Sequence, residues 1–326
     1  MASAADLRAL AAKLRAGRGM LAKADIAPVA ERLGLSAESA VPVGDDCAAI
    51  PDGDGYLLLA IEGFMNEFVA GDPWFAGWCG VMVNISDVAA MGGRPIAVVD
   101  ALWADGGGPA ATILEGMRAA SERFGVPVVG GHSNIRSDRG QLSVAILGRA
   151  RRLLTSFDAR PGQRLVMAVD LRGRYREPFS NWEAATDAPA ARLREDLSLL
   201  PQIAEAGLAR AAKDISQAGI VGTAAMLAEC SGVSIVIDID TIPKPEGVPL
   251  ERWLVSFPSF GYLLAVAAVD VPAVIRLFAG RGIAAADIGA IGAGHAVSIA
   301  GGGVTETVWD FVERPLLGCA AREVVA

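Results

Sequence analysis

The segment from Pro73 to Gly93 constrains the fold more than any other part of this chain. Asp87 is its only charged residue, and most of the others are apolar. Asp72 before Pro73 predicts the start of a helix, and Gly92-Gly93 predicts its end. A helix with so few polar residues is typical of one that is buried on nearly every side. The sequence therefore predicts a long central helix inside a sizeable core.

The composition agrees with a large core. Hydrophobic residues make up 52% of the 326 residues and charged residues 20%, which excludes a disordered or fibrous chain. No apolar run approaches the roughly 18 residues that cross a bilayer, and the N-terminus lacks the apolar stretch of a signal peptide. We therefore expect a soluble, cytoplasmic protein without a membrane partner.

The charge balance limits the partners further. Lys and Arg number 29 against 37 Asp and Glu, a net charge of −8 without blocks of one sign, so a nucleic-acid-binding surface is not expected. An acidic protein that binds a phosphate compound needs a metal cation or local arginines. The cysteines are widely spaced and histidine is scarce, so a zinc site is disfavoured and we expect buried, unmodified thiols. The cysteines are Cys47, Cys79, Cys230 and Cys319.

Chain length predicts two domains, and the basic, turn-rich segment 149–162 marks the boundary between them. We expect one domain over 1–150 and another over 151–326. Strands and helices alternate irregularly, which favours an α+β fold over a Rossmann sheet. No GxGxxG fingerprint, Walker A loop or GxSxG elbow occurs.

Local patterns place the other elements. Apolar runs on both sides of the PDGDG turn predict a hairpin over 41–63, and the glycines that follow the strand 126–129 predict a loop over 130–134. The remaining predicted helices are 4–14, 25–34, 109–124, 189–206, 223–230 and 271–280. The remaining predicted strands are 96–103, 142–148, 165–170, 234–240 and 260–269.

Two acidic clusters are candidates for a metal site. The adjacent carboxylates of Asp45 and Asp46 follow Gly44 at the start of a strand, and they cannot both enter an apolar core without a counter-charge. They form either a solvated turn or oxygen ligands for Mg²⁺. Asn84 and Asp87 share one face of the buried helix, where a carboxylate needs a partner. That partner is either a metal or a structural hydrogen bond.

Two further clusters could contact a phosphate group. Gly130 and Gly131 permit close approach of a ligand to backbone N–H groups, although most such pairs are simple turns. His132 beside them is a candidate for direct chemistry, with a structural role as the alternative. Asp214 lies before the glycine-bearing start of a helix, where it is either a metal ligand beside an anion site or an ordinary helix cap.

The chain contains, in this order, the motifs GDDCAAI, NISDVAAMGGRPIAVVDAL, VPVVGGHSN, KDISQAGI, ECSGVSIVIDIDTIP and FPSFGYLLAV, and the resemblance that they carry runs over about residues 24–294. Together they resemble the PurM-like superfamily, which includes aminoimidazole ribonucleotide (AIR) synthase, selenophosphate synthetase and thiamine-monophosphate kinase. The resemblance implies an α+β, two-domain PurM-like fold. Its N-terminal AIR-synthase-type domain would bind ATP and form a homodimer through its strands, and its C-terminal domain would be an α/β sandwich.

The resemblance also implies roles for the candidate residues. The positions that match Asp45, Asp46, Asp87 and Asp214 bind the metal and the ATP phosphates. Those that match Gly130 and Gly131 lie against the nucleotide, and Gly44 and Asn84 are expected beside the same cofactor. An acidic protein that holds a polyphosphate through Mg²⁺ is consistent with the charge argument.

Departures from the family pattern leave the acceptor open. Glu62 replaces the Asp of selenophosphate synthetase, and the segment that carries Lys23 lacks that enzyme's reactive Cys. His132 replaces the Asp of the kinase's GGDT motif. We expect a Mg²⁺-dependent, ATP-using enzyme that transfers a phosphoryl group to a small molecule or activates one, with Lys23, Glu62 and His132 as catalytic candidates. A nucleotide-binding regulatory subunit and a plain interaction protein are the alternatives.

Overall fold

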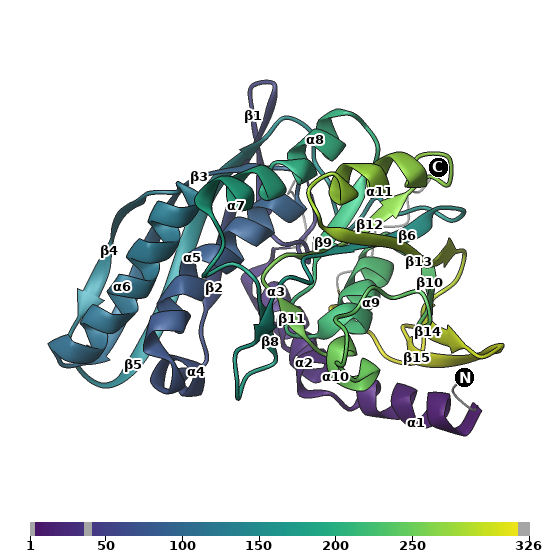
Figure 1. Ribbon diagram of the computed structural model, residues 1–326, viewed down its shortest axis with the longest axis horizontal. Helices are drawn as coiled ribbons and strands as arrows, with labels where there is room; N and C mark the ends of the chain where they lie inside the picture. Colours follow the sequence, from purple (N-terminus) through teal and green to yellow (C-terminus); the bar gives the residue numbers. More distant parts are fainter. Residues whose placement is uncertain (1–3, 36–40, 319–326) are drawn as a thin grey trace. The chain divides into compact units, whose positions relative to one another are not determined.

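The computed structural model describes residues 4–35 and 41–318, which form two compact units. The larger unit comprises Met1–Asp45, Leu153–Ala184 and Ile203–Ala326. The smaller unit comprises Asp46–Arg152 and Ala185–Gln202. Figure 1 labels the helices and strands of both units.

The two units differ from the continuous domains expected over 1–150 and 151–326. The chain does change unit at Arg152, inside the basic segment, but the N-terminal segment belongs to the larger unit. The reason is packing, because Leu7, Ala11 and Leu14 of the first helix lie in that unit's core. The segment 185–202 returns to the smaller unit.

A five-stranded sheet forms one layer of the smaller unit, in the order β1-β2-β5-β3-β4. The hairpin β1–β2 is antiparallel as predicted, whereas β4 pairs with β3 in parallel. The strands are β1 (Ala48–Asp52), β2 (Gly55–Gly63), β3 (Arg94–Asp105), β4 (Val128–Asn134) and β5 (Arg136–Ala150).

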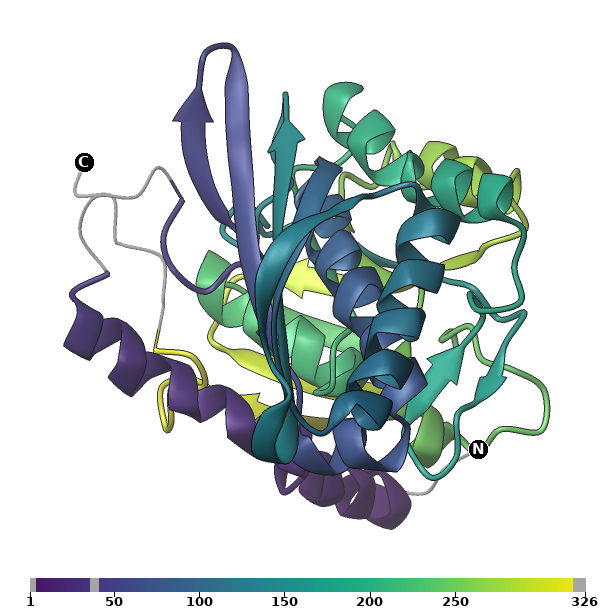
Figure 2. The ribbon, with the colours of Figure 1, turned by 90° about the vertical axis from the view of Figure 1, so that its left-hand side faces the viewer.

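Helices cover one face of this sheet, as Figure 2 shows. A Cβ at Gly80 would collide with Val144 of β5, so the central helix packs directly on the strands. Gly77 approaches the next long helix as closely, since a Cβ there would collide with the carbonyl oxygen of Ile113. The helices of this part are α4 (Asn66–Gly71), α5 (Pro73–Ala90), α6 (Gly107–Phe124), α7 (Ala190–Leu197) and α8 (Leu199–Glu205).

Helix α5 has the start and the burial that the sequence predicts. The carboxylate of Asp72 accepts a hydrogen bond from the backbone N–H of Phe75 at 3.1 Å, and Pro73 occupies the first turn. Every residue from Phe75 to Ala90 is buried. The prediction of a helix enclosed on nearly every side is confirmed.

A seven-stranded mixed sheet forms the larger unit, in the order β15-β14-β10-β13-β6-β12-β9. Helices α1 and α9 share one apolar core on one face, and α11 packs against β6 and β13. The strands are β6 (Arg164–Val169), β9 (Ala211–Asp214), β10 (Ser234–Asp238), β12 (Gly261–Val266), β13 (Ala284–Gly292), β14 (Ala296–Gly301) and β15 (Val304–Asp310).

Shorter elements complete the larger unit. A small sheet has the order β11-β8-β7. Its strands are β7 (Arg174–Tyr175), β8 (Asn181–Glu183) and β11 (Phe257–Pro258). The helices are α1 (Ala4–Arg15), α2 (Arg18–Leu21), η1 (Ala22–Asp25), α3 (Ile26–Leu33), α9 (Gly219–Ser231), α10 (Leu250–Leu254) and α11 (Val271–Ala279).

The architecture is α+β, as predicted, with some local differences. Residues 130–134 are not a loop, because they continue β4 and pair with β3. The helix expected over 189–206 divides at Ser198, and the strand expected over 260–269 ends at Val266. Cys47, Cys79 and Cys230 are buried and form no disulfide within the described part of the chain, while Cys319 lies outside it. In the described part of the chain, no helix is both long and apolar enough to cross a membrane.

Candidate functional site

Two of the predicted metal ligands come together in the smaller unit. A carboxylate oxygen of Asp46 and one of Asp87 lie within 4.8 Å of each other. The loop that carries Asp46 is tied to the end of α5, because the backbone N–H of Cys47 donates to Sδ of Met91 at 3.0 Å. Met91 lies one helical turn after Asp87. Local packing thus brings together two carboxylates that are 41 positions apart in the sequence.

Asn84 lies one turn before Asp87 and is fully buried. Its Nδ2 donates a hydrogen bond to the carbonyl oxygen of Gly80 at 2.8 Å. Its Oδ1 is also buried, and no described residue donates a hydrogen bond to it. Burial of an unsatisfied acceptor costs about 1–3 kcal/mol, so this oxygen suits a donor group or a cation from outside the chain.

Asp100 is a further, half-buried carboxylate, which the sequence analysis missed. On β3 it is directly opposite Val144 of β5, and Val144 lies beneath Gly80 of α5. Asp100 therefore points to the helix-covered face. No described residue donates a hydrogen bond to its buried Oδ2, and burial raises its pKa above the ordinary 3.8. The alternation of VVDALW could have revealed it, since Asp100 falls on the inward face of that strand.

Glu62 lies in the same row of the sheet as Asp100. Glu62 pairs with Val144 on one side, and Asp100 pairs with Val144 on the other. Residues that pair directly point to the same face, so both carboxylates lie on the helix-covered side, with roughly 10 Å between their backbones. The sheet therefore presents two more carboxylates on the side where α5 carries Asp87.

His132 lies on the opposite face of the sheet. It pairs with Ala101, which is one residue beyond Asp100 and therefore points the other way. Its ring lies 6.0 Å from that of Trp103, centroid to centroid. The structure does not bring His132 to the face that carries Glu62.

The two candidate glycines have different surroundings. A Cβ at Gly131 would collide with Oδ1 of Asp100, so this position excludes every larger residue. A Cβ at Gly130 would meet no atom within 4 Å. Both belong to β4, which is an edge strand of the sheet. On the side of β4 away from β3, its N–H groups pair with no other described strand. Contact with phosphate oxygens stays a prediction for both.

Asp45 has a different environment from its neighbour Asp46. Within the larger unit its Oδ2 accepts from the backbone N–H of Ser156 at 2.8 Å, and its Oδ1 accepts from the hydroxyl of Ser156 at 2.7 Å. The hydroxyl of Ser231 in turn donates to the carbonyl oxygen of Ser156 at 2.6 Å. Gly44 is close to α9, because the thiol of Cys230 lies 3.7 Å from its carbonyl oxygen. Asp45 thus anchors the chain that leads to Asp46. The role of Asp45 as a metal ligand stays a prediction.

Asp214 and Lys23 also belong to the larger unit. Asp214 is buried at the end of β9, and Lys23 lies half-buried in η1. After Asp214, the buried hydroxyl oxygen of Ser216 has no hydrogen-bond partner among the described residues, and α9 begins at Gly219 with φ of +69°. Because both residues belong to the other unit, their part in a site with Asp46 stays a prediction.

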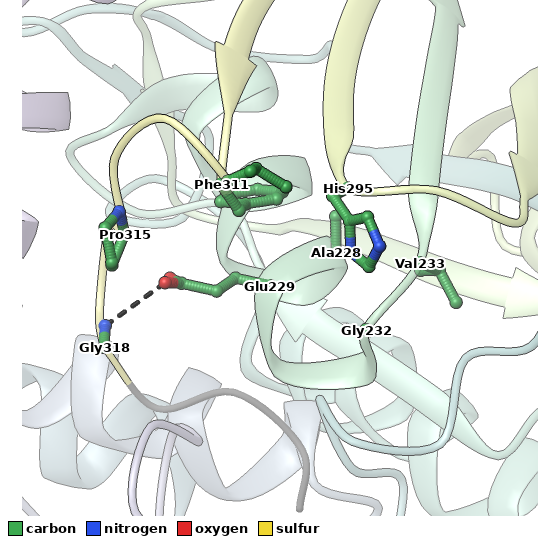
Figure 3. Close-up of a pocket in the computed structure, with 9 residues that line it drawn as sticks. Ala228, Glu229, Gly232, Val233, His295, Phe311, Pro315 and Gly318 are labelled. Atoms are coloured by element: carbon green, nitrogen blue, oxygen red, sulfur yellow. Dashed lines mark hydrogen bonds between the residues drawn. The ribbon is translucent and has the colours of Figure 1, made fainter. Parts of the chain in front are cut away.

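A cavity of about 270 Å³ lies at the end of α9, and Figure 3 shows its lining. Glu229 points from α9 to the turn at 315–318, where its carboxylate accepts hydrogen bonds from three consecutive backbone N–H groups. His295 and Ala228 also line this cavity. The carboxylate of Glu229 is thus already used to hold the chain, which marks a structural role.

The chain matches two family models. The model described as "AIR synthase related protein, N-terminal domain" matches residues 44–150. The model described as "AIR synthase related protein, C-terminal domain" matches residues 177–302. The first match contains Asp46, Asp87 and Asp100, and the second contains Asp214.

Two sequence relatives extend these matches. The Synechocystis protein sll0787 is 47% identical over 306 residues, which cover 92% of this chain and 94% of that protein. The thiamine-monophosphate kinase of Pyrococcus horikoshii is 30% identical over 222 residues, which cover 63% of this chain and 69% of the kinase.

Two solved structures have a similar fold. AaThiL, complexed with AMPPCP and TMP, superposes with a TM-score of 0.65 at 25% identity, over 83% of this chain and 91% of AaThiL. PurL of T. maritima, complexed with ATP, superposes with a TM-score of 0.70 at 21% identity, over 84% of this chain. The chain spans about half the length of that PurL, since the match covers 46% of it.

Proposed function

Because the chain belongs to the AIR synthase related family and has a PurM-like fold, we propose that it is a Mg²⁺-dependent, ATP-using enzyme. Its reaction would be phosphoryl transfer to a small molecule, or ATP-driven activation of one. The ATP and AMPPCP complexes of PurL and AaThiL support nucleotide binding by this fold. The small-molecule acceptor is left open by this proposal.

The observation that carries the proposal is the pair of carboxylates of Asp46 and Asp87, whose oxygens lie within 4.8 Å of each other. Asn84 adds a buried amide oxygen that accepts no hydrogen bond from the described residues. All three donors are hard oxygen atoms of the kind that Mg²⁺ prefers, so the residues fit this ion. Asp46, Asp87 and Asn84 would hold the ion, which would supply positive charge to offset the negative charge of the nucleotide phosphates.

Other residues of the proposed site have subsidiary roles. Asp45 orients the chain at Asp46, and Asp214 of the larger unit stays a predicted metal ligand. Glu62 and Asp100, on the helix-covered face, either complete the metal environment or orient the acceptor. Glycines 44, 130 and 131 let the nucleotide approach the backbone, while Lys23 and His132 stay catalytic candidates.

We also propose that the enzyme is a homodimer that forms through the open face of the five-stranded sheet. Large apolar side chains are exposed there, with Leu59 at 47%, Ile61 at 69% and Val99 at 42% of full exposure. Leu59 and Ile61 lie on β2 and Val99 lies on β3, with β5 between these two strands. Ala145 of β5 pairs with both Ile61 and Val99, so the apolar side chains continue across all three strands. Such surfaces mark interaction sites in proteins of this size.

A nucleotide-binding subunit without turnover is the second candidate. The observation that favours it is the separation of Glu62 and His132 on opposite faces of one sheet. In that case the chain would bind Mg-ATP but would consume none with any acceptor.

The test measures ATP binding by calorimetry and ADP formation with a panel of small acceptors, each with Mg²⁺ or with EDTA. We expect ADP formation that requires Mg²⁺ and that is lost in Asp87→Asn. Asp138→Asn is the matched control, because its side chain is 75% exposed and pairs with the neighbouring Arg139. Binding without turnover favours the second candidate, and an Asp87→Asn variant as active as Asp138→Asn contradicts the metal site.

A further inference from the structure

The side chain of Met91 connects the two proposed metal ligands of the smaller unit. Met91 follows the last residue of α5 and is fully buried. We propose that Met91 is a positioning residue, whose thioether holds the loop of Asp46 at the distance from Asp87 that a divalent ion requires. This inference rests on the proposed function, because it concerns the affinity of the same metal site.

Met91 forms a hydrogen bond on each side of the site. Its backbone N–H donates to the carbonyl oxygen of Asp87 at 3.3 Å. Its Sδ accepts from the backbone N–H of Cys47 at 3.0 Å, and Cys47 directly follows Asp46 in the chain. A single residue therefore connects the backbone at one carboxylate to the backbone next to the other.

The position of Met91 is set by the way in which α5 ends. Gly92 has φ of +73°, and its N–H donates to the carbonyl oxygen of Ala89 at 2.8 Å, which closes the helix. Gly93 packs closely on β2, because a Cβ there would collide with the side chain of Leu58. The sulfur of Met91 is therefore presented from a helix end that is itself fixed against the sheet.

The loop that carries Asp46 precedes the hairpin. β1 begins at Ala48, so the strand pairing of the hairpin starts only after Cys47. Without a cation, the carboxylates of Asp46 and Asp87 repel each other, since their oxygens lie within 4.8 Å. The hydrogen bond to Met91 opposes this repulsion. An incoming ion then finds its ligands close together, which reduces the cost of ordering them on binding.

A thioether suits this position because it is apolar enough for the core and still accepts a hydrogen bond. Leucine has a similar volume but no acceptor, and exchange of these two residues is among the best tolerated in cores. Met91→Leu therefore removes the hydrogen bond and keeps the packing. Met82→Leu is the matched control, because Met82 also lies on α5, is 3% exposed, and its sulfur accepts no hydrogen bond from the described residues.

The test titrates the metal-free full chain with Mn²⁺ and measures the free ion by electron paramagnetic resonance. We expect Met91→Leu to bind Mn²⁺ roughly three- to tenfold more weakly than the wild type, the effect of about 0.65–1.4 kcal/mol. Met82→Leu should bind it as the wild type does. Melting in EDTA checks that each variant is folded.

Met91→Gln separates the hydrogen bond from the packing. Its amide oxygen is again an acceptor, but its polar amide is placed in an apolar core. It should therefore be less stable than Met91→Leu in EDTA and yet bind Mn²⁺ more tightly. If the affinities of these two variants follow their stabilities instead, Met91 has only a packing role and the inference is overturned.

A second measurement needs no metal. Exchange of the Cys47 amide proton is followed by NMR in the metal-free chain with isotope-labelled cysteine, and it should be roughly three- to tenfold faster in Met91→Leu than in the wild type or Met82→Leu. Equal exchange in Met91→Leu and the wild type, or equal Mn²⁺ affinity, would overturn the inference and leave the proposed metal site standing. If the wild type binds no Mn²⁺ at millimolar concentrations, the proposed metal site fails and the inference fails with it.

Discussion

The effect of the replacement Asp87→Asn on stability should depend on Mg²⁺. Asn keeps the shape of the side chain but removes one of two negative charges whose oxygens lie within 4.8 Å of each other. At an effective dielectric constant of about 20 the repulsion of two such charges is about 3.5 kcal/mol, and in bulk water about 0.9 kcal/mol. Without a cation, the variant should therefore be more stable than the wild type by roughly 1–3 kcal/mol.

Addition of Mg²⁺ should reduce or reverse this stability difference. A ligand at 100 times its dissociation constant stabilises the folded state by about 2.7 kcal/mol. The wild type, which keeps both carboxylates, gains this stabilisation, whereas the variant gains little of it. The difference in free energy of unfolding between wild type and Asp87→Asn should therefore shrink or change sign as the Mg²⁺ concentration rises.

The assay is calorimetric melting of wild type, Asp87→Asn and Asp138→Asn in EDTA and in a Mg²⁺ series. One kcal/mol corresponds to about 2–4 °C in the midpoint for domains of 150–250 residues, so the expected changes are measurable. Asp138→Asn should follow the wild type in every buffer. The reasoning is refuted if Asp87→Asn is less stable than the wild type by the same amount with and without Mg²⁺.

Three other changes test neighbouring parts of the structure. Ser156→Ala removes a hydroxyl hydrogen bond to the carboxylate of Asp45 and should lower the free energy of unfolding by about 1.5–3 kcal/mol, measured by urea denaturation; no loss would contradict the anchoring role. Because burial raises the pKa of Asp100, the folded state holds its proton more tightly than the unfolded chain, and wild-type stability falls as pH rises above 3.8. Asp100→Asn should then exceed the wild type in melting temperature at pH 7 without Mg²⁺ and lose this advantage toward pH 3.8; an advantage that is independent of pH would argue against this origin. Ile61→Asp, on the open face of the sheet, should convert a dimer to a folded monomer in sedimentation analysis, and an unchanged dimer would place the interface elsewhere.

The helices and strands with clear ends could be predicted from the sequence. Asp72 and Gly92 set the ends of α5 through local chemistry, a side-chain cap and a residue with positive φ, and the structure has both. Residues 130–134 could not be predicted as a strand, because their glycines favour a turn. Their extended form depends on hydrogen bonds to β3, which is distant in sequence.

The candidate site was predictable only in part, for a similar reason. Asp46 and Asp87 each stand out locally, one beside a glycine and the other as the only charge of an apolar helix. Their proximity depends on the packing of the loop against the end of α5. Asp45 looks equivalent to Asp46 in the sequence, but its environment is set by the distant Ser156. Asp100 is flanked by apolar residues on both sides in β3, and its surroundings depend on the pairing of β3 with β4 and β5.

The central claim is that Asp46 and Asp87 hold one divalent ion at the phosphates of a nucleotide. Anomalous diffraction from a crystal grown with Mn²⁺ and AMPPCP tests it most directly, because Mn²⁺ replaces Mg²⁺ at oxygen sites and can be located by its own scattering. We predict a peak at about 2.0–2.2 Å from a carboxylate oxygen of each residue and beside the nucleotide phosphates. The claim would be contradicted if the nucleotide is bound and its Mn²⁺ is coordinated by other residues but by neither Asp46 nor Asp87.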